Sequence, residues 1–278
     1  MRVLTSLAEI ASDYDAIVFD QWGVLHDGAT PYPRAVQAVQ HLHDQGNVLA
    51  VLSNSGKRAS PNAARIAALG FPDVWFHTVM TSGEALWRDV AQGRIEAKSI
   101  LPIERAPGDA SDWAKGLDLA LVDHPEAADA ILLMGLPDGS ELSHWSRIME
   151  SARKLGLPVY CSNPDRASPR AGGKTVVSPG ALAFHHLDAG GEVSLYGKPH
   201  RPIFDALQSA LGVTRLLMVG DSLEHDIAGG HAAGWDTALI KGGLYAKDFA
   251  QDSAEAVLSR LVKEKRAPNP TYVIEDLR

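Results

Sequence analysis

Asp20 stands where a carboxylate could act as a nucleophile. It follows the apolar run AIVF, and Gln21, Trp22 and Gly23 come directly after it. A carboxylate can attack phosphorus or an activated carbon and form a covalent intermediate. Gly23 would allow the sharp backbone turn that exposes such a group. The alternative for Asp20 taken alone is a strand end or helix cap, where aspartate is common.

A pair of acidic residues lies in GDSLEHDIAGG, residues 220–230. Asp221 ends a predicted strand, and Asp226 follows five residues later near the start of a predicted helix, so both carboxylates can approach one cation. Oxygen ligands suit a hard cation such as Mg²⁺, which takes one or two carboxylates plus substrate phosphate. The structural alternative is that Asp221 caps the helix and Asp226 interacts favourably with the helix dipole.

Two further motifs carry residues suited to an anionic ligand. VLSNSGKR places Ser53 and Asn54 at a strand end, where a hydroxyl and backbone N–H groups suit a phosphoryl oxygen. The same residues are also ordinary turn formers. Lys198, in YGKPH, could balance the charge between an attacking carboxylate and an anionic substrate. An isolated lysine is more often solvated surface.

The elements that must position these residues alternate along the chain. Short runs rich in Val, Ile and Leu lie between helical patterns, which is typical of a buried parallel sheet. Predicted strands cover residues 16–20, 48–53, 130–135, 158–162, 193–197, 215–221 and 237–242, and predicted helices include 33–46, 60–70 and 144–156. The pattern therefore predicts an α/β fold built from βαβ units.

The four candidates share one relation to the predicted strands. Asp20, Ser53, Lys198 and Asp221 each come at the end of a predicted strand. In an open parallel sheet the carboxyl ends of the strands meet at one edge, where ligands bind. We therefore expect all four side chains to meet at one edge of the same sheet.

Together the motifs FDQWGVLHDG, VLSNSGKR, YGKPH and GDSLEHDIAGG resemble those of the haloacid dehalogenase-like (HAD-like) superfamily, over nearly the whole chain. The strings TSGEAL (81–86), CSNPDR (161–166), SPGAL (178–182) and GKP (197–199) are similar to those of its class IIA members. The resemblance implies a Rossmann-like parallel-sheet core with an inserted smaller α/β cap domain. We expect residues 1–80 and 180–278 to form the core and residues 81–179 to form the cap, which would close over the mouth of the core.

The resemblance also implies a reaction, a Mg²⁺-dependent hydrolysis of a small phosphorylated metabolite. Asp20 would form an aspartyl-phosphate, Ser53 would bind the transferring group, and Lys198 would steady nucleophile and phosphate. Mg²⁺ would be held by Asp20, the backbone carbonyl of Trp22 and Asp221, with Asp226 binding directly or through water. The predicted substrate contacts are Asn54, Ser55, Asn163 and Asp165.

Trp22 departs from the family pattern. Phosphatases of this superfamily usually carry a second aspartate two residues after the nucleophile, acting as general acid and then base. The indole N–H only donates and does not titrate, whereas a positioned acid or base contributes about 10² to 10⁴ in rate. His26, Asp27 and Asp165 are candidates for the missing acid. The alternative is a leaving group that is already acidic, as in acyl, aryl or anhydride phosphates.

Two other functions stay open at this point. Superfamily dehalogenases carry an aromatic residue at the position of Trp22, so a dehalogenase-type hydrolase using the same Asp20 fits the motif. A catalytically weak relative that binds a phosphorylated ligand also fits. The acidic pair, the class IIA strings and the Gly-rich second motif favour phosphoryl chemistry.

The amino-acid composition limits the kinds of binding partner that we expect. The formal net charge is −8, which disfavours a nucleic-acid or anionic-membrane surface. No run approaches the roughly 18 to 20 apolar residues of a membrane span. Cys161 is the only cysteine and the N-terminus has no signal-peptide stretch, so we expect a cytoplasmic protein with a small-molecule substrate. A homodimer stays open.

Overall fold

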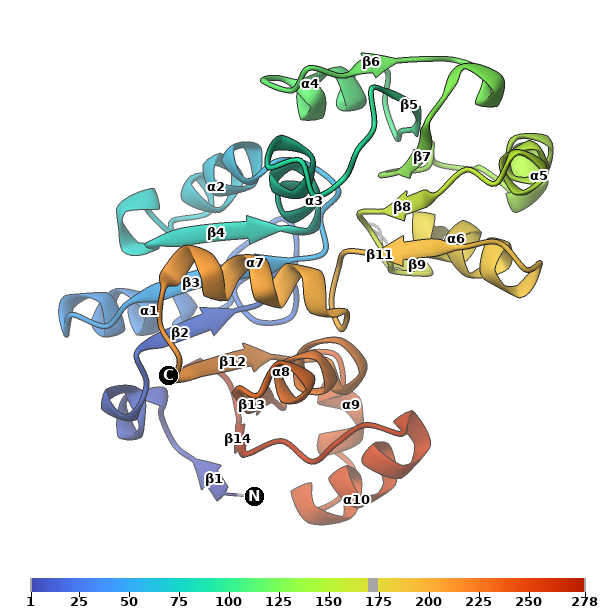
Figure 1. Cartoon of the computed structure of the whole chain (residues 1–278). Coiled ribbons are helices and arrows are strands. Elements are labelled where there is room, and N and C mark those ends of the chain that lie inside the picture. Colours follow the sequence, from blue (N-terminus) through green and yellow to red (C-terminus); the bar gives the residue numbers. More distant parts are fainter. Residues whose placement is uncertain (1, 170–174, 278) are drawn as a thin grey trace. The chain divides into compact units, whose positions relative to one another are not determined.

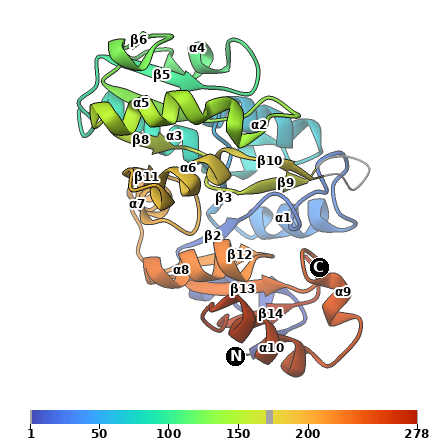
Figure 2. The same ribbon diagram turned by 90° about the vertical axis from the view of Figure 1, so that its right-hand side faces the viewer.

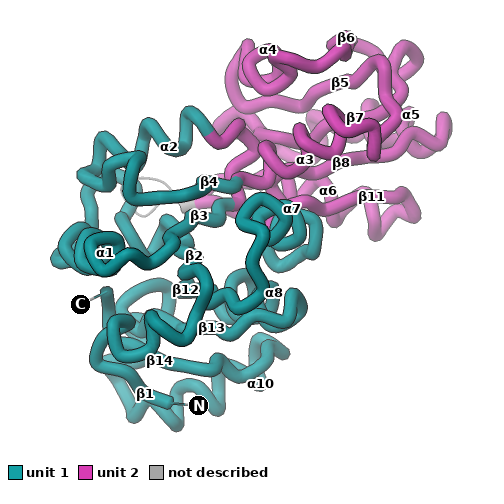
Figure 3. The backbone as a smooth tube through the Cα atoms, turned by 60° about the vertical axis from the view of Figure 1, so that its left-hand side comes forward, with its two compact units in different colours: residues 1–53, 60–80, 198–278 teal, residues 54–59, 81–197 magenta. Residues whose placement is uncertain are grey.

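The computed structural model describes residues 2–169 and 175–277. The chain forms two compact units, coloured separately in Figure 3. The first, which we call the core unit, comprises residues 1–53, 60–80 and 198–278. The second, which we call the cap unit, comprises residues 54–59 and 81–197.

A seven-stranded sheet forms the centre of the core unit, with strand order β1-β14-β13-β12-β2-β3-β4 (Figure 1). Every pairing from β1 to β3 is parallel. The strands are β1 (Arg2–Leu4), β2 (Ala16–Phe19), β3 (Leu49–Ser53), β4 (Thr78–Thr81), β12 (Leu216–Gly220), β13 (Asp236–Ile240) and β14 (Tyr272–Ile274). The central strands β2 and β12 are buried along their whole length, which explains their continuous apolar sequence.

Helices cover both faces of this sheet, as the alternation of buried residues on β13 shows. Ala238 and Ile240 pack into the apolar cluster that includes Val39 of α1 (Ala35–Asp44), whereas Leu239 packs with Leu258 of α10 (Ala254–Lys265). These helices can be followed in Figure 2. The remaining helical elements are η1 (Leu7–Glu9), η2 (Ala11–Asp13), α2 (Ala59–Ala68), η3 (Asp73–Trp75), α7 (Arg201–Leu211), η7 (Leu223–Ile227), α8 (Ala228–Ala233) and α9 (Ala246–Phe249).

The cap unit has a parallel sheet of its own, with strand order β11-β8-β7-β5-β6. Its strands are β5 (Ser99–Ile103), β6 (Ala120–Leu121), β7 (Ala130–Leu133), β8 (Val159–Cys161) and β11 (Val193–Leu195), and an antiparallel hairpin is made of β9 (Ala167–Pro169) and β10 (Thr175–Val177). Its helical elements are α3 (Ser82–Ala91), α4 (Asp109–Ala114), η4 (Pro125–Ala127), η5 (Leu142–Trp145), α5 (Ser146–Leu155) and α6 (Pro179–Asp188). Leu133, Met149, Val159 and Leu182 belong to its buried apolar cluster.

The α/β architecture with a smaller inserted α/β unit is as predicted, but the expected division of the chain needs correction. The inserted unit begins at residue 81 as expected, yet the chain returns to the core at Lys198 and not at residue 180. The reason is that β11 pairs in parallel with β8, with Val193 opposite Val159. A short apolar run does not reveal which of two sheets it will join.

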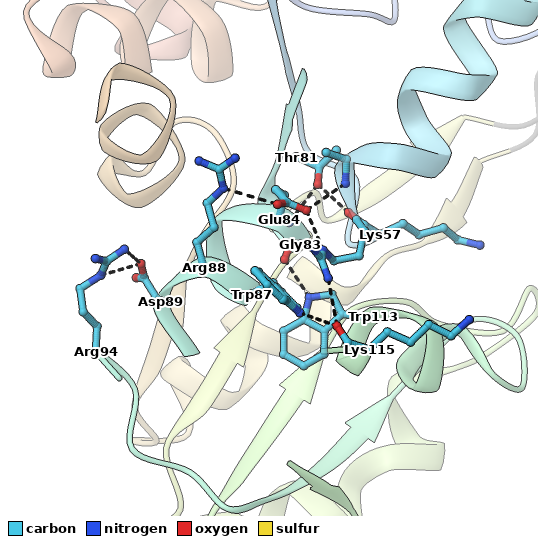
Figure 4. A network of polar contacts seen from close by, with 12 residues as sticks. Lys57, Thr81, Gly83, Glu84, Trp87, Arg88, Asp89, Arg94, Trp113 and Lys115 are labelled. Carbon is cyan, nitrogen blue, oxygen red and sulfur yellow. Dashed lines mark hydrogen bonds and ion pairs between the residues drawn. The ribbon is translucent and has the colours of Figure 1, made fainter. Parts of the chain in front are cut away.

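Residues 54–59 also belong to the cap unit, although the sequence predicts them as core. The buried Glu84 of α3, labelled in Figure 4, accepts hydrogen bonds from Arg58 Nε at 2.6 Å and from the backbone N–H of Ala59 at 3.2 Å. The hydroxyl of Thr81 accepts from the Glu84 N–H at 2.9 Å and donates to the Lys57 carbonyl at 2.5 Å. These bonds fix residues 57–59 to the start of α3.

Packing around this contact accounts for the TSGEAL motif. A β-carbon on Gly83 would lie 2.1 Å from the Gly56 carbonyl oxygen, so only glycine lets the two segments approach this closely. Trp113 Nε1 donates to the Gly83 carbonyl at 2.7 Å, and the Arg58 guanidinium lies 3.7 Å from the centre of the Trp87 ring. Burial raises the pKa of Glu84, but the hydrogen bond and charge of Arg58 outweigh this effect, and the pKa is lowered overall.

No helix within residues 2–169 and 175–277 has the length and apolar character needed to cross a membrane.

Candidate active site

Asp20 and Asp221 leave neighbouring strands at the same edge of the core sheet. Phe19 of β2 is in register with Val219 of β12 and with Val51 of β3. The backbone N–H of Asp20 donates to the Val219 carbonyl at 2.9 Å, and Asp221 follows the end of β12. Ser53 is the last residue of β3, so the register places it at this same edge.

Lys198 joins this edge through two short ion pairs. Its Nζ lies 2.6 Å from Asp20 Oδ1 and 2.7 Å from Asp226 Oδ1, and only 3% of the residue is exposed. The expectation that Lys198 follows a strand of the same sheet is wrong, since β11 belongs to the cap sheet. The lysine instead enters the site from the segment that precedes α7.

The three aspartates form a compact acidic cluster. One carboxylate oxygen from each of Asp20, Asp221 and Asp226 lies within 4.8 Å of the others. Asp226 Oδ2 accepts from the Ser222 N–H at 3.1 Å, and Asp221 Oδ2 accepts from the Leu244 N–H at 2.8 Å. Asp226 lies on the short helical turn η7, for which Ser222 is the N-cap residue. The cluster is therefore held by backbone donors from two separate loops.

The charges in this cluster do not balance. Burial raises the pKa of Asp20 to about 6; the Lys198 charge opposes this effect and the Asp226 charge adds to it. Burial, followed by the charges of Asp20 and Asp226, raises the pKa of Asp221 to about 8. Burial alone would lower the pKa of Lys198, but the two carboxylates bonded to it raise it. When all three carboxyl groups are ionised, they and one ammonium leave an excess of negative charge, which a divalent cation would neutralise.

Two glycines keep space beside Asp221. A β-carbon on Gly23 would lie 1.6 Å from Asp221 Oδ2, and a β-carbon on Gly243 would lie 2.4 Å from Asp221 Cβ and 2.8 Å from the Gly23 carbonyl oxygen. The cluster thus combines carboxylate oxygens, excess negative charge and two neighbouring glycines that leave space. These features fit a hard cation such as Mg²⁺. The Trp22 carbonyl stays a predicted ligand.

The loop after Asp20 contains Trp22, His26 and Asp27. The Trp22 side chain packs edge-on against His26, with ring centres 6.2 Å apart, and the residue is 41% exposed. His26 is fully buried, and its Nδ1 accepts from the Gly28 N–H at 2.9 Å. Asp27 Oδ1 accepts from the backbone N–H groups of Ala29 and Thr30 at 2.9 and 2.8 Å.

These contacts argue against His26 and Asp27 as the missing general acid. Burial lowers the pKa of His26 to about 4, with the Arg65 charge adding to the effect, so the imidazole is neutral at pH 7. The bond from Gly28 assigns its proton to Nε2, and a neutral imidazole N–H is not an acid at this pH. The backbone bonds from Thr30 and Ala29 hold the pKa of Asp27 below its usual range, so that carboxylate stays ionised.

The predicted substrate contacts Asn54, Ser55, Asn163 and Asp165 all belong to the cap unit, and the structure brings them together there. Asn54 Nδ2 donates to Asp165 Oδ1 at 2.8 Å, and Asn163 Oδ1 accepts from the Asp165 N–H at 3.2 Å. Ser55 and Asn163 line a cavity of about 140 Å³ within the cap unit.

The same cavity contains residues that the sequence reasoning did not single out. Lys57, Arg105 and Asp109 line it, and Lys57 Nζ pairs with Asp109 at 2.8 Å. The only sequence signal for Lys57 is its place two residues after Ser55 in VLSNSGKR. Arg105 lies in a polar loop after β5, and nothing in the sequence around it indicates a functional role.

Comparisons with known proteins agree with this architecture. Residues 17–109 match the family model described as haloacid dehalogenase-like hydrolase, and residues 195–278 match the HAD-hydrolase-like model. Mouse chronophin is 28% identical over 283 residues, covering 98% of this chain and 94% of that protein.

Two solved structures share the fold. A haloacid dehalogenase-like hydrolase from Brucella suis 1330 has a TM-score of 0.80 and 27% identity, covering 99% of this chain and all of that chain. The magnesium complex of a glycerol phosphate phosphatase from Mycobacterium tuberculosis has a TM-score of 0.73 and 24% identity, covering 97% of this chain and 77% of that one. The two family models, together with a fold that carries the four motifs, show that the chain belongs to the haloacid dehalogenase-like hydrolases.

Proposed function

We propose that this hydrolase is a Mg²⁺-dependent phosphatase that acts on a small phosphorylated metabolite through Asp20. The observation that carries the proposal is the acidic cluster. Asp20 forms an ion pair with the buried Lys198, and the carboxylates of Asp221 and Asp226 lie beside it. The family membership supports hydrolysis, and similarity to a protein named a glycerol phosphate phosphatase supports phosphorus as the reacting centre.

The residues of the core unit account for a two-step reaction. In the first step a carboxylate oxygen of Asp20 attacks phosphorus, and the bond from phosphorus to the leaving oxygen breaks. Lys198 orients the attacking carboxylate and offsets its charge, and Ser53 binds a phosphoryl oxygen. In the second step water attacks the aspartyl-phosphate, which releases phosphate and regenerates Asp20. When bound by Asp20, Asp221 and Asp226, Mg²⁺ supplies positive charge that reduces repulsion between the carboxylate and the phosphate.

We further propose that the cap cavity, with Asn163 and Ser55 in its wall, contacts the part of the substrate beyond the phosphoryl group. Asn54 and Asp165 contact the substrate as a pair, because their side chains are hydrogen-bonded to each other. The cavity of about 140 Å³ has room for a small part of the substrate.

Asp20→Asn tests the nucleophile. The wild type, with Mg²⁺, should hydrolyse 4-nitrophenyl phosphate or acetyl phosphate and leave 2-chloropropionate intact, whereas Asp20→Asn should lose more than about 10³-fold in kcat/KM. Mass spectrometry of acid-quenched wild type should find phosphate on the peptide containing Asp20. Asp27→Asn is the matched control, since Asp27 is exposed and bonded only within its own turn.

The outcomes separate the candidate functions. Activity that survives in Asp20→Asn would exclude Asp20 as the nucleophile. Turnover of the haloacid alone would replace the phosphatase by a dehalogenase using the same carboxylate. Binding of a phosphate mimic without turnover of any substrate would make the protein a phosphoryl-ligand-binding relative.

A further inference from the structure

A phosphate ester of an ordinary alcohol needs a proton donor at its leaving oxygen, because an alkoxide is a strong base. The group nearest in sequence to Asp20 is Gln21, an amide that is buried and donates to Asn62 Oδ1 at 3.0 Å. Trp22 follows, and its indole N–H does not titrate in this range. His26 Nδ1 already accepts from the Gly28 N–H, and both carboxylate oxygens of Asp27 accept hydrogen bonds within its own turn. Asp221 and Asp226 are assigned to the cation. Asp165, the remaining candidate, belongs to the cap unit, where its Oδ1 accepts from Asn54 Nδ2 at 2.8 Å. Among the described residues of this loop and acidic cluster, none outside the cation site is placed to act as a general acid.

The indole of Trp22 is built into this loop. A β-carbon on Gly28 would lie 2.2 Å from Trp22 Cζ2, so the glycine makes the room that the ring occupies. His26 also contacts the ring edge-on. Trp22 also immediately precedes Gly23, whose α-carbon approaches the Asp221 carboxylate. Residue 22 therefore lies beside the acidic cluster, with a large non-titrating side chain that its neighbours hold in place.

We propose that Trp22 restricts this enzyme to phosphate compounds whose leaving group departs as a stable anion without a proton from the protein. The substrate class is acyl phosphates, aryl phosphates and phosphoanhydrides, and simple alkyl phosphates are poor substrates. The inference rests on the proposed phosphatase function. In the step concerned, the Asp20 oxygen forms the new bond to phosphorus, and the departing carboxylate, phenolate or phosphate keeps the electron pair of the broken bond. A proton is taken from solvent only after departure.

The dependence of rate on leaving-group basicity tests this proposal in the wild-type protein. We would measure kcat/KM with Mg²⁺ for acetyl phosphate, a series of substituted phenyl phosphates and glycerol phosphate, because kcat/KM reports the step in which the leaving group departs. The values should fall steeply with rising leaving-group pKa across the phenyl series. Glycerol phosphate should be slower than 4-nitrophenyl phosphate by at least the roughly 10² to 10⁴ that a positioned acid supplies.

Trp22→Asp places a carboxyl group at the same backbone position, and Trp22→Phe is the matched control that keeps a non-titrating ring. The ratio of kcat/KM for 4-nitrophenyl phosphate to that for glycerol phosphate should shrink by about 10² or more in Trp22→Asp. It should stay within a few-fold of the wild type in Trp22→Phe. Using the ratio removes any uniform loss of activity caused by the substitutions.

The outcomes distinguish a failure of the proposed leaving-group restriction from a failure of the proposed phosphatase function. If the wild type hydrolyses phosphate compounds with a shallow dependence on leaving-group pKa, the phosphatase function stands and the proposed restriction is overturned. An unchanged ratio in an active Trp22→Asp protein overturns the role of Trp22. If no phosphate compound is hydrolysed by the wild type, the proposed function itself fails. The wild-type series decides the question even when Trp22→Asp does not fold.

Discussion

At the scale of single residues, the geometry of the acidic cluster depends on a missing side chain. Gly23 has a φ of +80°, and a β-carbon there would collide with Asp221 Oδ2. Gly46 has a nearly identical φ of +83°, but a β-carbon there would meet nothing within 4 Å. An alanine at either position would have similar backbone strain, but only at position 23 would its β-carbon collide with a neighbour. Comparing the two substitutions therefore separates the effect of strain from the effect of the collision.

We predict that Gly23→Ala weakens Mg²⁺ binding and that Gly46→Ala does not. Backbone strain should cost about 1 kcal/mol of stability in each variant, because alanine is disfavoured at positive φ. Only Gly23→Ala should also displace the Asp221 carboxylate and raise the Kd for Mg²⁺ by about tenfold or more, measured by titration calorimetry. Equal Mg²⁺ affinity in both variants would show that the spacing beside Asp221 is not needed.

At the scale of secondary-structure elements, the segment 54–59 is fixed to α3 by a buried ion pair. The Glu84 side chain is 9% exposed and that of Arg58 is 23% exposed, with the two groups 2.6 Å apart. Glu84 also accepts from the Ala59 N–H at 3.2 Å. Removing its charge leaves a partly buried guanidinium with a weaker partner, which costs more than losing a pair in water.

Glu84→Gln should therefore lower the free energy of unfolding by about 2 kcal/mol. Glu150→Gln is the control, because Glu150 pairs with Lys154 at 2.7 Å on the exposed face of α5, where the two side chains are 56% and 72% exposed. That change should cost less than about 0.5 kcal/mol. Urea unfolding followed by circular dichroism and by tryptophan fluorescence provides the comparison. Similar losses for the two variants would mean that the Glu84 contact contributes no more than a surface pair.

At the scale of the whole molecule, the raised pKa values of Asp20 and Asp221 link stability to pH. An aspartate in the unfolded chain has a pKa of about 3.9, whereas these two have pKa values of about 6 and about 8 when folded. Between those limits these two groups bind more protons in the folded protein than in the unfolded chain. Their contribution to stability in the absence of metal should therefore fall as pH rises from about 4 towards 8. His26, whose pKa is lowered to about 4, contributes in the opposite direction and only below about pH 6.5.

Mg²⁺ binds the ionised carboxylates, so the increase in Tm that it causes should be larger at pH 8 than at pH 5.5. Scanning calorimetry with and without chelator at the two pH values measures this difference. Asp221→Asn should lose most of the Mg²⁺ effect, while Asp118→Asn, at a fully exposed aspartate, should keep it. An effect of Mg²⁺ that is equal at both pH values would contradict the assignment of these carboxylates as the ligands.

The sequence by itself determined the core strands that end in Asp20, Ser53 and Asp221. Each strand is a continuous apolar run that a doubly covered parallel sheet requires, and each polar residue stands where its run stops. These are local relations along the chain, and strand register carries them directly to one edge of the sheet. Residue type and spacing also indicated Lys198 and Asp226 as candidates, and the resemblance of the motifs implied their roles and the family.

Only the tertiary structure decided what depends on partners distant in sequence. It assigned β11 to the cap sheet through its pairing with β8, and it fixed residues 57–59 to α3 through Glu84. The lowered pKa of His26 comes from burial and from the Arg65 charge, which no spacing predicts. The physical reason is that pairing, burial and pKa are properties of a residue's surroundings, and those surroundings are assembled only when the chain has folded.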